Sequence, residues 1–255
     1  MIKIAVYGKG GIGKSTTVSN IAVVLAEKGL KVMQIGCDPK ADSTIALRHG
    51  EEMPAVLDIF RKKKQNLKLD DMVKIGYQGV ICVEAGGPTP GLGCAGRGII
   101  TALEKLKETG AYKVYQPDVI LYDVLGDVVC GGFSMPMRKG YADKVFIVTS
   151  GENMSIHAGA NIAMAVENFK NRGYASLGGL ILNRRNVERE EEKVQELAED
   201  FHTKVIGTLS RSELVAKAEE EGKTVMECFP DSDMAEEYRK LAEEMIALCK
   251  EETAC

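Results

Sequence analysis

Residues 8–15 have the composition and spacing of a loop that binds phosphate groups. They read Gly-Lys-Gly-Gly-Ile-Gly-Lys-Ser, directly after an apolar run and directly before a helical pattern. Glycines let consecutive backbone N–H groups turn toward a phosphate, and the helix N-terminus adds the positive end of its dipole. In this spacing Lys14 is expected to reach the β- and γ-phosphates of a nucleotide, and Ser15 to bind Mg²⁺. A glycine turn without a ligand is the structural alternative, but the strand, loop and helix together favour a nucleotide site.

Three aspartates follow apolar runs that read as strands. Asp38 and Asp42 come after the run that ends at residue 36, and Asp123 ends another run. Because the carboxyl ends of parallel strands meet at one edge of a sheet, all three are expected beside the phosphate loop. Asp123 has the place of a Walker B aspartate, which holds the Mg²⁺ shell, while Asp38 is placed to orient an attacking water and Asp42 to sense the metal. A lone Asp is often a helix cap, but three of them beside one phosphate loop favour catalysis.

The chain has seven cysteines, an odd number that is unusual for a secreted disulfide scaffold and fits a reducing compartment. Cys94 lies in a glycine-rich segment, and Cys130 lies seven residues beyond Asp123, so both follow strand ends at the same edge of the sheet. Neither is part of a C-x-x-C pair, so one chain does not supply the four thiolates of a [4Fe–4S] cluster, whereas two chains would. Burial as small apolar side chains is the alternative for both. The other five default to packing or to exposed thiols: Cys37, Cys82, Cys228, Cys249 and Cys255.

Short apolar runs alternate with longer helical patterns from one end of the chain to the other. The runs that read as strands are 2–7, 31–36, 79–84, 119–123, 144–149, 177–182 and 204–207, and helical spacing covers 15–28, 98–109, 155–171, 188–201 and 231–250. Near-continuous apolar strands are expected where helices cover both faces of a sheet. The alternation implies right-handed βαβ units, so the sequence predicts an α/β fold with a doubly wound, mainly parallel sheet. No linker or repeat divides the chain, and residues 1–255 are expected to form one nucleotide-binding iron–sulfur domain.

The composition narrows the class of partner. The 255 residues carry a net charge of −4, with 33 Lys and Arg against 37 Asp and Glu, so no general basic field favours nucleic acid. The apolar runs are shorter than the roughly 20 residues needed to cross a bilayer, and the N-terminus lacks the layout of a signal peptide. We therefore expect a cytoplasmic protein with no nucleic-acid partner and no membrane partner. The basic run 61–64 and the acidic stretch 188–200 read as solvated helix surfaces.

Lys9 adds a feature that an ordinary phosphate loop does not need. A second lysine at this place is typical of the deviant Walker A type of P-loop NTPase, which includes the nitrogenase iron protein and the division-site and plasmid-partition ATPases. An exposed loop charge is the plain alternative. In the class that the loop resembles, the equivalent lysine reaches the nucleotide of a facing subunit, so the resemblance implies a homodimer whose closure depends on ATP.

Five segments of the chain closely resemble the nitrogenase iron protein family. They are 8–15, 36–44, 86–88, 93–98 and 122–133, and the likeness extends over almost the whole chain. The resemblance implies an ATP-hydrolysing electron-transfer reductase. Such a protein is a homodimer with one [4Fe–4S] cluster between its subunits, and it delivers low-potential electrons to a larger catalytic component. A ferredoxin or flavodoxin-type donor is expected upstream.

The resemblance also assigns roles residue by residue. MgATP or MgADP would bind at Gly8, Lys9, Gly10, Gly11, Ile12, Gly13, Lys14, Ser15, Thr16 and Asn183, the last of them near the adenine. Catalytic and switch roles would fall to Lys9, Lys14, Asp38, Asp42, Asp123 and Asp127. Cys94 and Cys130 of each chain would hold the cluster, and Arg97 would lie on the docking surface, where some members are ADP-ribosylated. Because only seven residues join Asp123 to Cys130, order gained at the nucleotide is expected to displace the cluster ligand.

Departures from the family pattern leave the partner open. The chain ends soon after its last helix, residues 43–58 look shortened, and Ser210 stands where a proline commonly precedes Arg211. Shortened ends are typical of nitrogenase-like reductases, whose partners reduce tetrapyrroles or cleave carbon–sulfur bonds, such as the nickel-tetrapyrrole reductive cyclase of coenzyme F430 synthesis. Arg97 points the other way, because the protochlorophyllide-reducing members usually lack an arginine beside the first cluster cysteine.

Two other classes of function compete with the reductase. A positioning or partition ATPase without redox chemistry would explain Lys9 and Lys14 but would leave the segments around Cys94 and Cys130 unexplained. Membrane-positioning members are expected to have a basic amphipathic C-terminal helix, whereas residues 231–250 are rich in glutamate. An iron–sulfur scaffold or carrier ATPase would more naturally have two cysteines close together in the chain.

Overall fold

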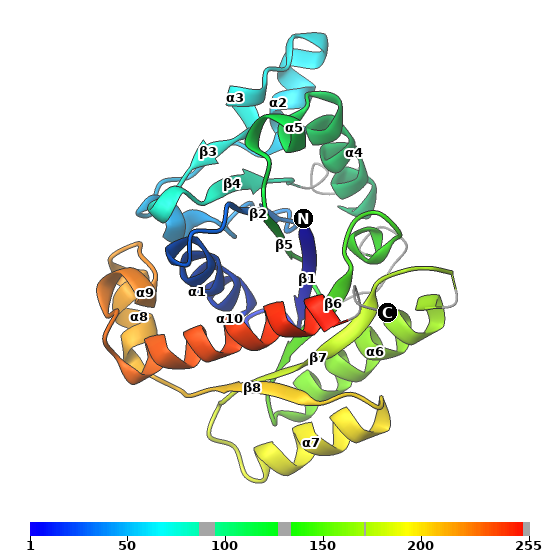
Figure 1. Cartoon of the computed structure of the whole chain (residues 1–255), viewed down its shortest axis with the longest axis vertical. Helices are drawn as coiled ribbons and strands as arrows, with labels where there is room; N and C mark the ends of the chain where they lie inside the picture. The colour runs from blue at the N-terminus through cyan, green and yellow to red at the C-terminus, as the bar shows by residue number, and fades with distance from the viewer. Residues whose placement is uncertain (87–94, 127–133, 171, 252–255) are drawn as a thin grey trace.

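Eight strands in the described part of the chain form one sheet. The computed structural model describes residues 1–86, 95–126, 134–170 and 172–251. The strands lie in the order β3-β4-β2-β5-β1-β6-β7-β8, and each pairing is parallel except that of β3 with β4. Their bounds are β1 Ile2–Gly8, β2 Val32–Gly36, β3 Lys74–Ile75, β4 Ile81–Glu84, β5 Val119–Asp123, β6 Lys144–Thr149, β7 Ser176–Asn183 and β8 Val205–Leu209. The predicted doubly wound, mainly parallel sheet is confirmed (Figure 1).

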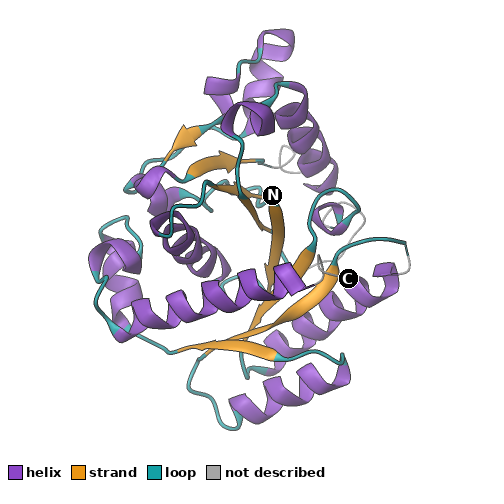
Figure 2. Ribbon diagram, viewed as in Figure 1, coloured by secondary structure: helices purple, strands orange, loops and turns teal. Residues whose placement is uncertain are grey.

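Helices cover both faces of this sheet (Figure 2). One apolar core lies between the strands and α1, α9 and α10, and the other lies between the strands and α2, α4, α6 and α7. The helices are α1 Lys14–Glu27, α2 Val56–Lys63, α3 Leu69–Met72, α4 Ala95–Glu108, α5 Ala111–Tyr115, α6 Asn153–Lys170, α7 Glu190–Asp200, α8 Glu213–Glu220, α9 Val225–Cys228 and α10 Asp233–Glu251. Short 3₁₀ turns are η1 Ile45–Arg48, η2 Lys64–Asn66, η3 Tyr77–Gly79 and η4 Met135–Met137.

Helix α1 is enclosed by the rest of the fold. Its residues from Thr17 to Leu25 are all buried, and it packs against β1, β2 and β5 of the sheet and against α9 and α10. A helix at a protein surface normally keeps a polar face in water. The burial of α1 therefore makes it a central element, and the phosphate loop lies at its N-terminus.

The register of the strands brings the ends of β2, β4 and β5 into one row beside Val6, near the end of β1. Asp123 of β5 lies opposite Val6 of β1 on one side and opposite Gly36 of β2 on the other. Gly36 in turn lies opposite Glu84 of β4. These strands are parallel, so the loops that follow them leave the same edge of the sheet, which is where ligands bind in folds of this kind.

Several elements differ from the sequence expectation. β4 begins at Ile81 rather than at residue 79, because Tyr77–Gly79 forms a 3₁₀ turn. The sequence pattern does not predict β3, α2 or α8. β3 is a two-residue edge strand, too short to show a pattern, and α2 follows Ala55, which has no side chain that could cap a helix. α8 does have a recognisable signal, because Ser212 caps its N-terminus.

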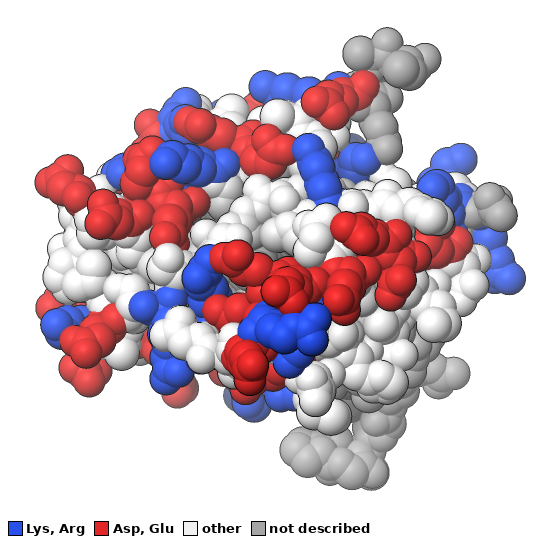
Figure 3. Space-filling view, turned by 90° about the horizontal axis from the view of Figure 1, so that it is seen from below, with Lys and Arg blue, Asp and Glu red and all other residues white. Residues whose placement is uncertain are grey.

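The face seen in Figure 3 carries charges of both signs. Acidic side chains form a band across it, with basic side chains between them. Ion pairs on the described surface, such as Lys28 with Glu243 at 2.5 Å and Lys204 with Glu244 at 2.8 Å, are exposed. Exposed pairs of this kind contribute little stability each.

In the described ranges every helix is too short or too polar to span a bilayer.

Replacement of Leu241 by alanine should destabilise the fold. Leu241 of α10 is 2% exposed. It packs closely over Gly207 of β8, since a Cβ added to this glycine would lie 2.8 Å from Cδ1 of Leu241. Loss of a buried leucine side chain costs about 2–5 kcal/mol. Met164→Ala in α6, at a helix position that is 52% exposed, should change the free energy of unfolding by less than about 0.5 kcal/mol. Chemical denaturation measures both variants, and equal midpoints would contradict this role of α10 in the core.

Candidate functional site

The phosphate loop turns from β1 into α1 in a conformation that glycine adopts readily. Gly11 and Gly13 have φ angles of 73° and 91°, in the left-handed region. A Cβ added to Gly13 would also lie 2.5 Å from Nδ2 of Asn183. Gly13 is the N-cap of α1 and makes no side-chain cap bond. The first N–H groups of α1 are therefore placed to bind an anion, and this arrangement fits the phosphates of a nucleotide.

Lys14 and Asp123 form a buried ion pair at the start of α1. Lys14 Nζ lies 2.6 Å from Asp123 Oδ1, and the two side chains are 8% and 1% exposed. Burial by itself lowers the pKa of Lys14, but the charge and hydrogen bond of Asp123, with a smaller contribution from Asp38, raise that pKa overall. Lys14 is therefore a charged ammonium held by a carboxylate in a largely buried place.

The second oxygen of Asp123 binds the segment that follows β2. Ser43 Oγ donates to Asp123 Oδ2 at 2.6 Å. The carbonyl of Ser43 accepts from Ser19 Oγ of α1 at 3.1 Å and from Gln34 Nε2 of β2 at 2.9 Å. Residues 38–44, called the switch segment below, are thus connected to the phosphate loop through one carboxylate.

Glu84 at the end of β4 is a buried carboxylate that the sequence analysis does not single out. Its Oε1 accepts the backbone N–H of Thr44 at 2.7 Å and the hydroxyl of Thr44 at 2.6 Å. The side chain is 0% exposed. Desolvation raises the pKa of Glu84 to about 7, although the two bonds from Thr44 act in the opposite direction. The pattern that points to Asp123, an apolar strand that ends in an acidic residue, is present here too.

The predicted catalytic residues within the described ranges lie at one edge of the sheet. Lys14 and Asp123 are in direct contact. Asp38 is half-buried and its charge acts on Lys14. Asp42 is exposed, and Lys9 is half-buried in the loop. The structure thus brings the loop lysines and the three aspartates to the same region, but only one pair of them in contact.

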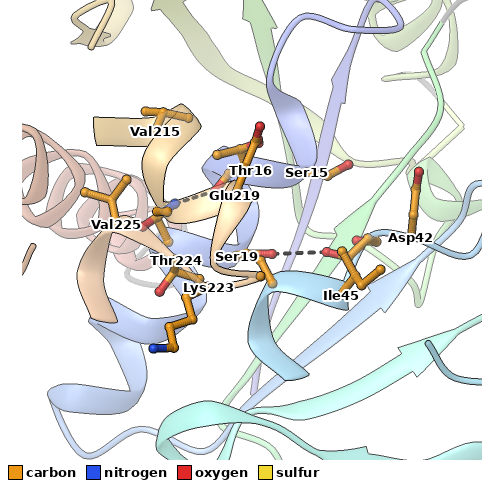
Figure 4. A pocket seen from close by; sticks show the side chains of 15 residues that line it. Ser15, Thr16, Ser19, Asp42, Ile45, Val215, Glu219, Lys223, Thr224 and Val225 are labelled. Atoms are coloured by element: carbon orange, nitrogen blue, oxygen red, sulfur yellow. Dashed lines mark hydrogen bonds between the residues drawn. The ribbon is translucent and has the colours of Figure 1, made fainter. Parts of the chain in front are cut away.

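A cavity of about 360 Å³ opens beside the phosphate loop (Figure 4). Ser15 and Asp42 lie on one side of it, and Val215 of α8 lies on the other. Between them Thr16 Oγ1 donates to Glu219 Oε1 at 2.9 Å. A polar wall from the phosphate loop and the switch segment thus faces a wall in which apolar residues such as Val215 and Val225 stand beside Glu219 and Lys223.

A second cavity, of about 290 Å³, begins at Gly13 and extends along the ends of β7 and β8. Asn183, the last residue of β7, donates through Nδ2 to the carbonyl of Ile12 at 2.6 Å. Arg185 donates through Nη2 to the carbonyl of Gly11 at 2.8 Å. Both side chains hold the phosphate loop from outside, and the part played by Arg185 has no signal in the sequence around it.

Ser210 stands at the place where the family commonly has a proline, and it makes two contacts with α10. Its backbone N–H and its hydroxyl donate to the two carboxylate oxygens of Glu237 on α10, at 2.7 and 2.6 Å. A proline has no N–H to donate. Beside it, Arg211 donates to the carbonyl of Arg185 at 3.3 Å. The wall of the second cavity is therefore tied to the last helix of the chain.

Comparisons with known proteins decide the family. Residues 2–253 match the family model described as 4Fe-4S iron sulfur cluster binding proteins, NifH/frxC family. The chain belongs to this family. It is 52% identical over 249 residues to the nitrogenase iron protein of Methanospirillum hungatei, with 96% of this chain and 88% of the relative covered. It is 48% identical over 257 residues to nitrogenase iron protein 2 of Methanothermococcus thermolithotrophicus, again covering 96% of this chain and 88% of the relative.

Membership of the NifH/frxC family settles the chemistry in outline. The chain is an ATP-hydrolysing oxidoreductase component, and the family binds a [4Fe–4S] cluster and MgATP. Proteins of the family work as dimers that deliver electrons to a larger catalytic component.

Among solved structures, the cell division ATPase MinD of Pyrococcus furiosus has a TM-score of 0.73 at 21% identity, over 97% of this chain and 100% of MinD. At that identity the likeness shows the P-loop ATPase fold alone.

The predicted cluster ligands lie outside the described residues. These are Cys94 and Cys130, and the same holds for Asp127 and for the side chain of Arg97, whose backbone is in α4. The segments that contain the two cysteines follow β4 and β5, which are separated in the sheet by β2 alone. Two segments that begin so close together at one sheet edge fit a cluster that each chain ligates twice.

The remaining cysteines are removed from solvent to different degrees. Cys37, Cys82 and Cys249 are buried, and Cys228 is half-buried. Desolvation raises the pKa of Cys82 to about 12 and also raises that of Cys37. A thiol with a raised pKa is a poor nucleophile and metal ligand. Packing is therefore the role of Cys37 and Cys82, while Cys255 lies outside the described residues.

Glu84→Gln should remove a pH dependence of stability. Burial raises the pKa of Glu84 from its ordinary 4.5 to about 7, so between these values the folded chain holds a proton that the unfolded chain releases. Stability should therefore fall as the pH rises through this interval, by up to about 3 kcal/mol at 1.36 kcal/mol per pKa unit. Gln does not titrate, so this part of the slope should be absent from the variant. Urea unfolding across the interval measures it, and identical slopes in both proteins would contradict the assignment.

Proposed function

We propose that this chain is the ATP-driven, one-electron reductase of a nitrogenase or nitrogenase-like system. It would act as a homodimer that closes on MgATP and carries one cluster between its subunits. The observation that supports this most strongly is the double contact of Asp123, which binds Lys14 through one oxygen and Ser43 through the other. A nucleotide that displaces either contact acts on the segment that leads, seven residues later, to Cys130.

The nucleotide would bind along the phosphate loop and the second cavity. Residues 8–16 would hold the phosphates through backbone N–H groups and Lys14, and Asn183 would lie beside the adenine. Lys9 would reach the nucleotide of the facing subunit, and Ser15 would bind Mg²⁺. Asp38 would orient the attacking water. Switch roles are proposed for three aspartates: Asp42, Asp123 and Asp127.

ATP binding would act by competition for Lys14. In the structure Asp123 holds this ammonium at 2.6 Å. A terminal phosphate carries more negative charge than one carboxylate, and in a buried site, where water screens little, it draws Lys14 away. Asp123 would then lack a cation, and its carboxylate would become available to the Mg²⁺ that accompanies ATP and to the water bound to that ion. The exchange moves Asp123 and with it the segment that contains Cys130.

The cluster would be held by Cys94 and Cys130 of both chains. When bound, it supplies a one-electron centre whose potential depends on hydrogen bonding and on access of water. The part of this chain is to shift the two cysteine segments when the nucleotide changes. Hydrolysis of ATP would then reset the switch after the electron has left.

The catalytic component would dock at the surface around Arg97, and a ferredoxin or flavodoxin-type donor would reduce the chain. The relatives at 52% and 48% identity, which are named nitrogenase iron proteins, support a nitrogenase component. The departures from the family pattern, such as the shortened stretch 43–58 and Ser210 in place of proline, keep a nitrogenase-like component open, such as the nickel-tetrapyrrole reductive cyclase of coenzyme F430 synthesis.

Anaerobic purification tests the redox function directly. The dimer should be brown and should contain about four iron atoms per two chains, the content of one cubane cluster. Iron and sulfide analysis with a visible spectrum measures this. A colourless dimer that cannot be reconstituted to that iron content would reject the reductase in favour of a positioning or partition ATPase.

Asp123→Asn should leave the cluster in place but uncouple it from the nucleotide. In the wild type, MgATP should speed the removal of iron by a chelator, because the cysteine segments shift. In the variant the rates with and without MgATP should agree within about a factor of two, since the coupling between the two sites is lost. Asp118→Asn just before β5, where the carboxylate accepts the N–H of Lys31 at 2.9 Å, is the control. A normal MgATP response in Asp123→Asn would disprove this switch.

Partner choice can be tested by electron transfer to purified components. The reduced dimer is mixed with MgATP and either a nitrogenase component or a tetrapyrrole-reducing component, and ATP-dependent oxidation of the cluster is followed by its spectrum. Turnover with the nitrogenase component alone would exclude the nitrogenase-like partner, and turnover with the tetrapyrrole component alone would exclude nitrogenase.

A further inference from the structure

Glu84, the last residue of β4, binds Thr44 of the switch segment. The nucleotide chemistry proposed above does not use this carboxylate. Glu84 accepts two hydrogen bonds from Thr44 on the same oxygen. Both side chains are 0% exposed. The other oxygen, Oε2, has no hydrogen-bond partner among the described residues. A buried carboxylate that is satisfied on one side only is destabilising, so stability alone does not explain its presence.

Arg48 supplies a compensating charge from the other side of Thr44. It lies on η1, one turn after Thr44, and is 8% exposed. Its Nε donates to Thr44 Oγ1 at 3.4 Å, while its Nη2 has no partner within the described ranges. The charge of Arg48 acts on Glu84. The hydroxyl of Thr44 therefore lies between a carboxylate and a guanidinium that would pair directly if Thr44 moved away.

The backbone leaves no free space around this contact. A Cβ added to Gly36 of β2 would collide with Oε2 of Glu84 and would lie 2.6 Å from Cβ of Ser43. The absence of a side chain at Gly36 is thus what lets the switch segment and Glu84 meet over β2. Close-packed interiors transmit displacements because they have no voids to absorb them. A shift of Thr44 must therefore be followed by Glu84 or must break the contact.

Neighbouring residues of the switch segment bind two different strands. Ser43 binds β5 through Asp123, and Thr44 binds β4 through Glu84. β5 leads to Cys130, and β4 leads to Cys94, which comes ten residues after Glu84. One segment thus has a side-chain connection to each of the two strands that precede the cysteines.

We propose that Glu84 is a positioning residue that couples the switch segment to β4 and thereby to the segment that contains Cys94. This inference rests on the proposed function, in which Asp42 responds to MgATP. Asp42 is two residues before Thr44, so its movement toward the metal displaces Thr44. Glu84 then follows Thr44 and takes the end of β4 with it.

Arg48 gives the displaced arrangement a hydrogen bond of its own. When Glu84 follows Thr44, its unpartnered oxygen pairs with the unpartnered group of Arg48, so neither charge is left alone in the core. The contact therefore has two arrangements, each with its own hydrogen bonds, as a switch requires. Because a second strand is engaged, the nucleotide acts on both cysteine segments of each chain rather than on one.

Thr44→Val and Thr44→Ser separate the effect of the hydroxyl from that of the side-chain shape. In the loaded dimer, the MgATP-dependent rise in the rate of iron chelation should fall about fivefold in Thr44→Val, the factor that corresponds to one hydrogen bond. Thr44→Ser keeps the hydroxyl and should respond as the wild type does. Thr149→Val, which removes an equally buried threonine hydroxyl at the end of β6, should also respond normally.

Hydrogen exchange at the backbone amides of residues 81–86 gives a readout that does not depend on chelation. MgATP should change this exchange in the wild type and in Thr44→Ser, and should change it much less in Thr44→Val, which keeps only the backbone bond to Glu84. If Thr44→Val does not fold, Glu84→Gln takes its place, because a neutral amide oxygen accepts the same bonds more weakly and should reduce both responses.

Different results would overturn the coupling through β4 and the nucleotide switch. A normal MgATP response of Thr44→Val, or of Glu84→Gln in its place, in both measurements would overturn the coupling through β4 and leave the proposed function intact. A wild-type dimer that holds a cluster but shows no MgATP response in either measurement would overturn the nucleotide switch and the coupling together.

Discussion

Asp123 is the point at which the phosphate loop and the switch segment meet. Its two oxygens bind Lys14 and Ser43, and at 1% exposure it has no access to water as an alternative partner. A buried carboxylate exchanges one polar partner for another or pays a large desolvation cost. The parallel pairing of β5 with β1 on one side and with β2 on the other determines which partners Asp123 can reach. The sheet therefore decides which groups respond when a charged ligand enters.

The polar interior of this site is not what the fold needs for stability. Four charged residues of the site are at most 8% exposed: Lys14, Asp123, Glu84 and Arg48. Glu84 and Arg48 each have a polar atom without a partner among the described residues. Replacing such groups by apolar side chains is often neutral or stabilising in proteins. The pattern fits a site in which stability is given up so that two arrangements of the same groups have similar free energy.

Local sequence determines the parts of the site that could be predicted. Glycine spacing followed by a helix start marks the phosphate loop, and an apolar run with a terminal Asp marks Asp123. The fold class follows from the alternation of strands and helices in the same way. Glu84 has the same local pattern as Asp123, but its partner Thr44 is 40 residues away in the chain, and that pairing is visible only once the strand order is known. The contact of Arg185 with Gly11 spans 174 residues and has no local signal at all. The cluster ligands come from the family resemblance.

The burial of α1 has a consequence for how two subunits can communicate. A helix that is packed against strands and helices along most of its length cannot slide or tilt without opening the core. Phosphates bound at its N-terminus, as proposed, would therefore be fixed relative to their own subunit. In a dimer, the distance between the two bound nucleotides would then report the distance between the two subunits, so hydrolysis at either site would be sensitive to how closely the subunits approach.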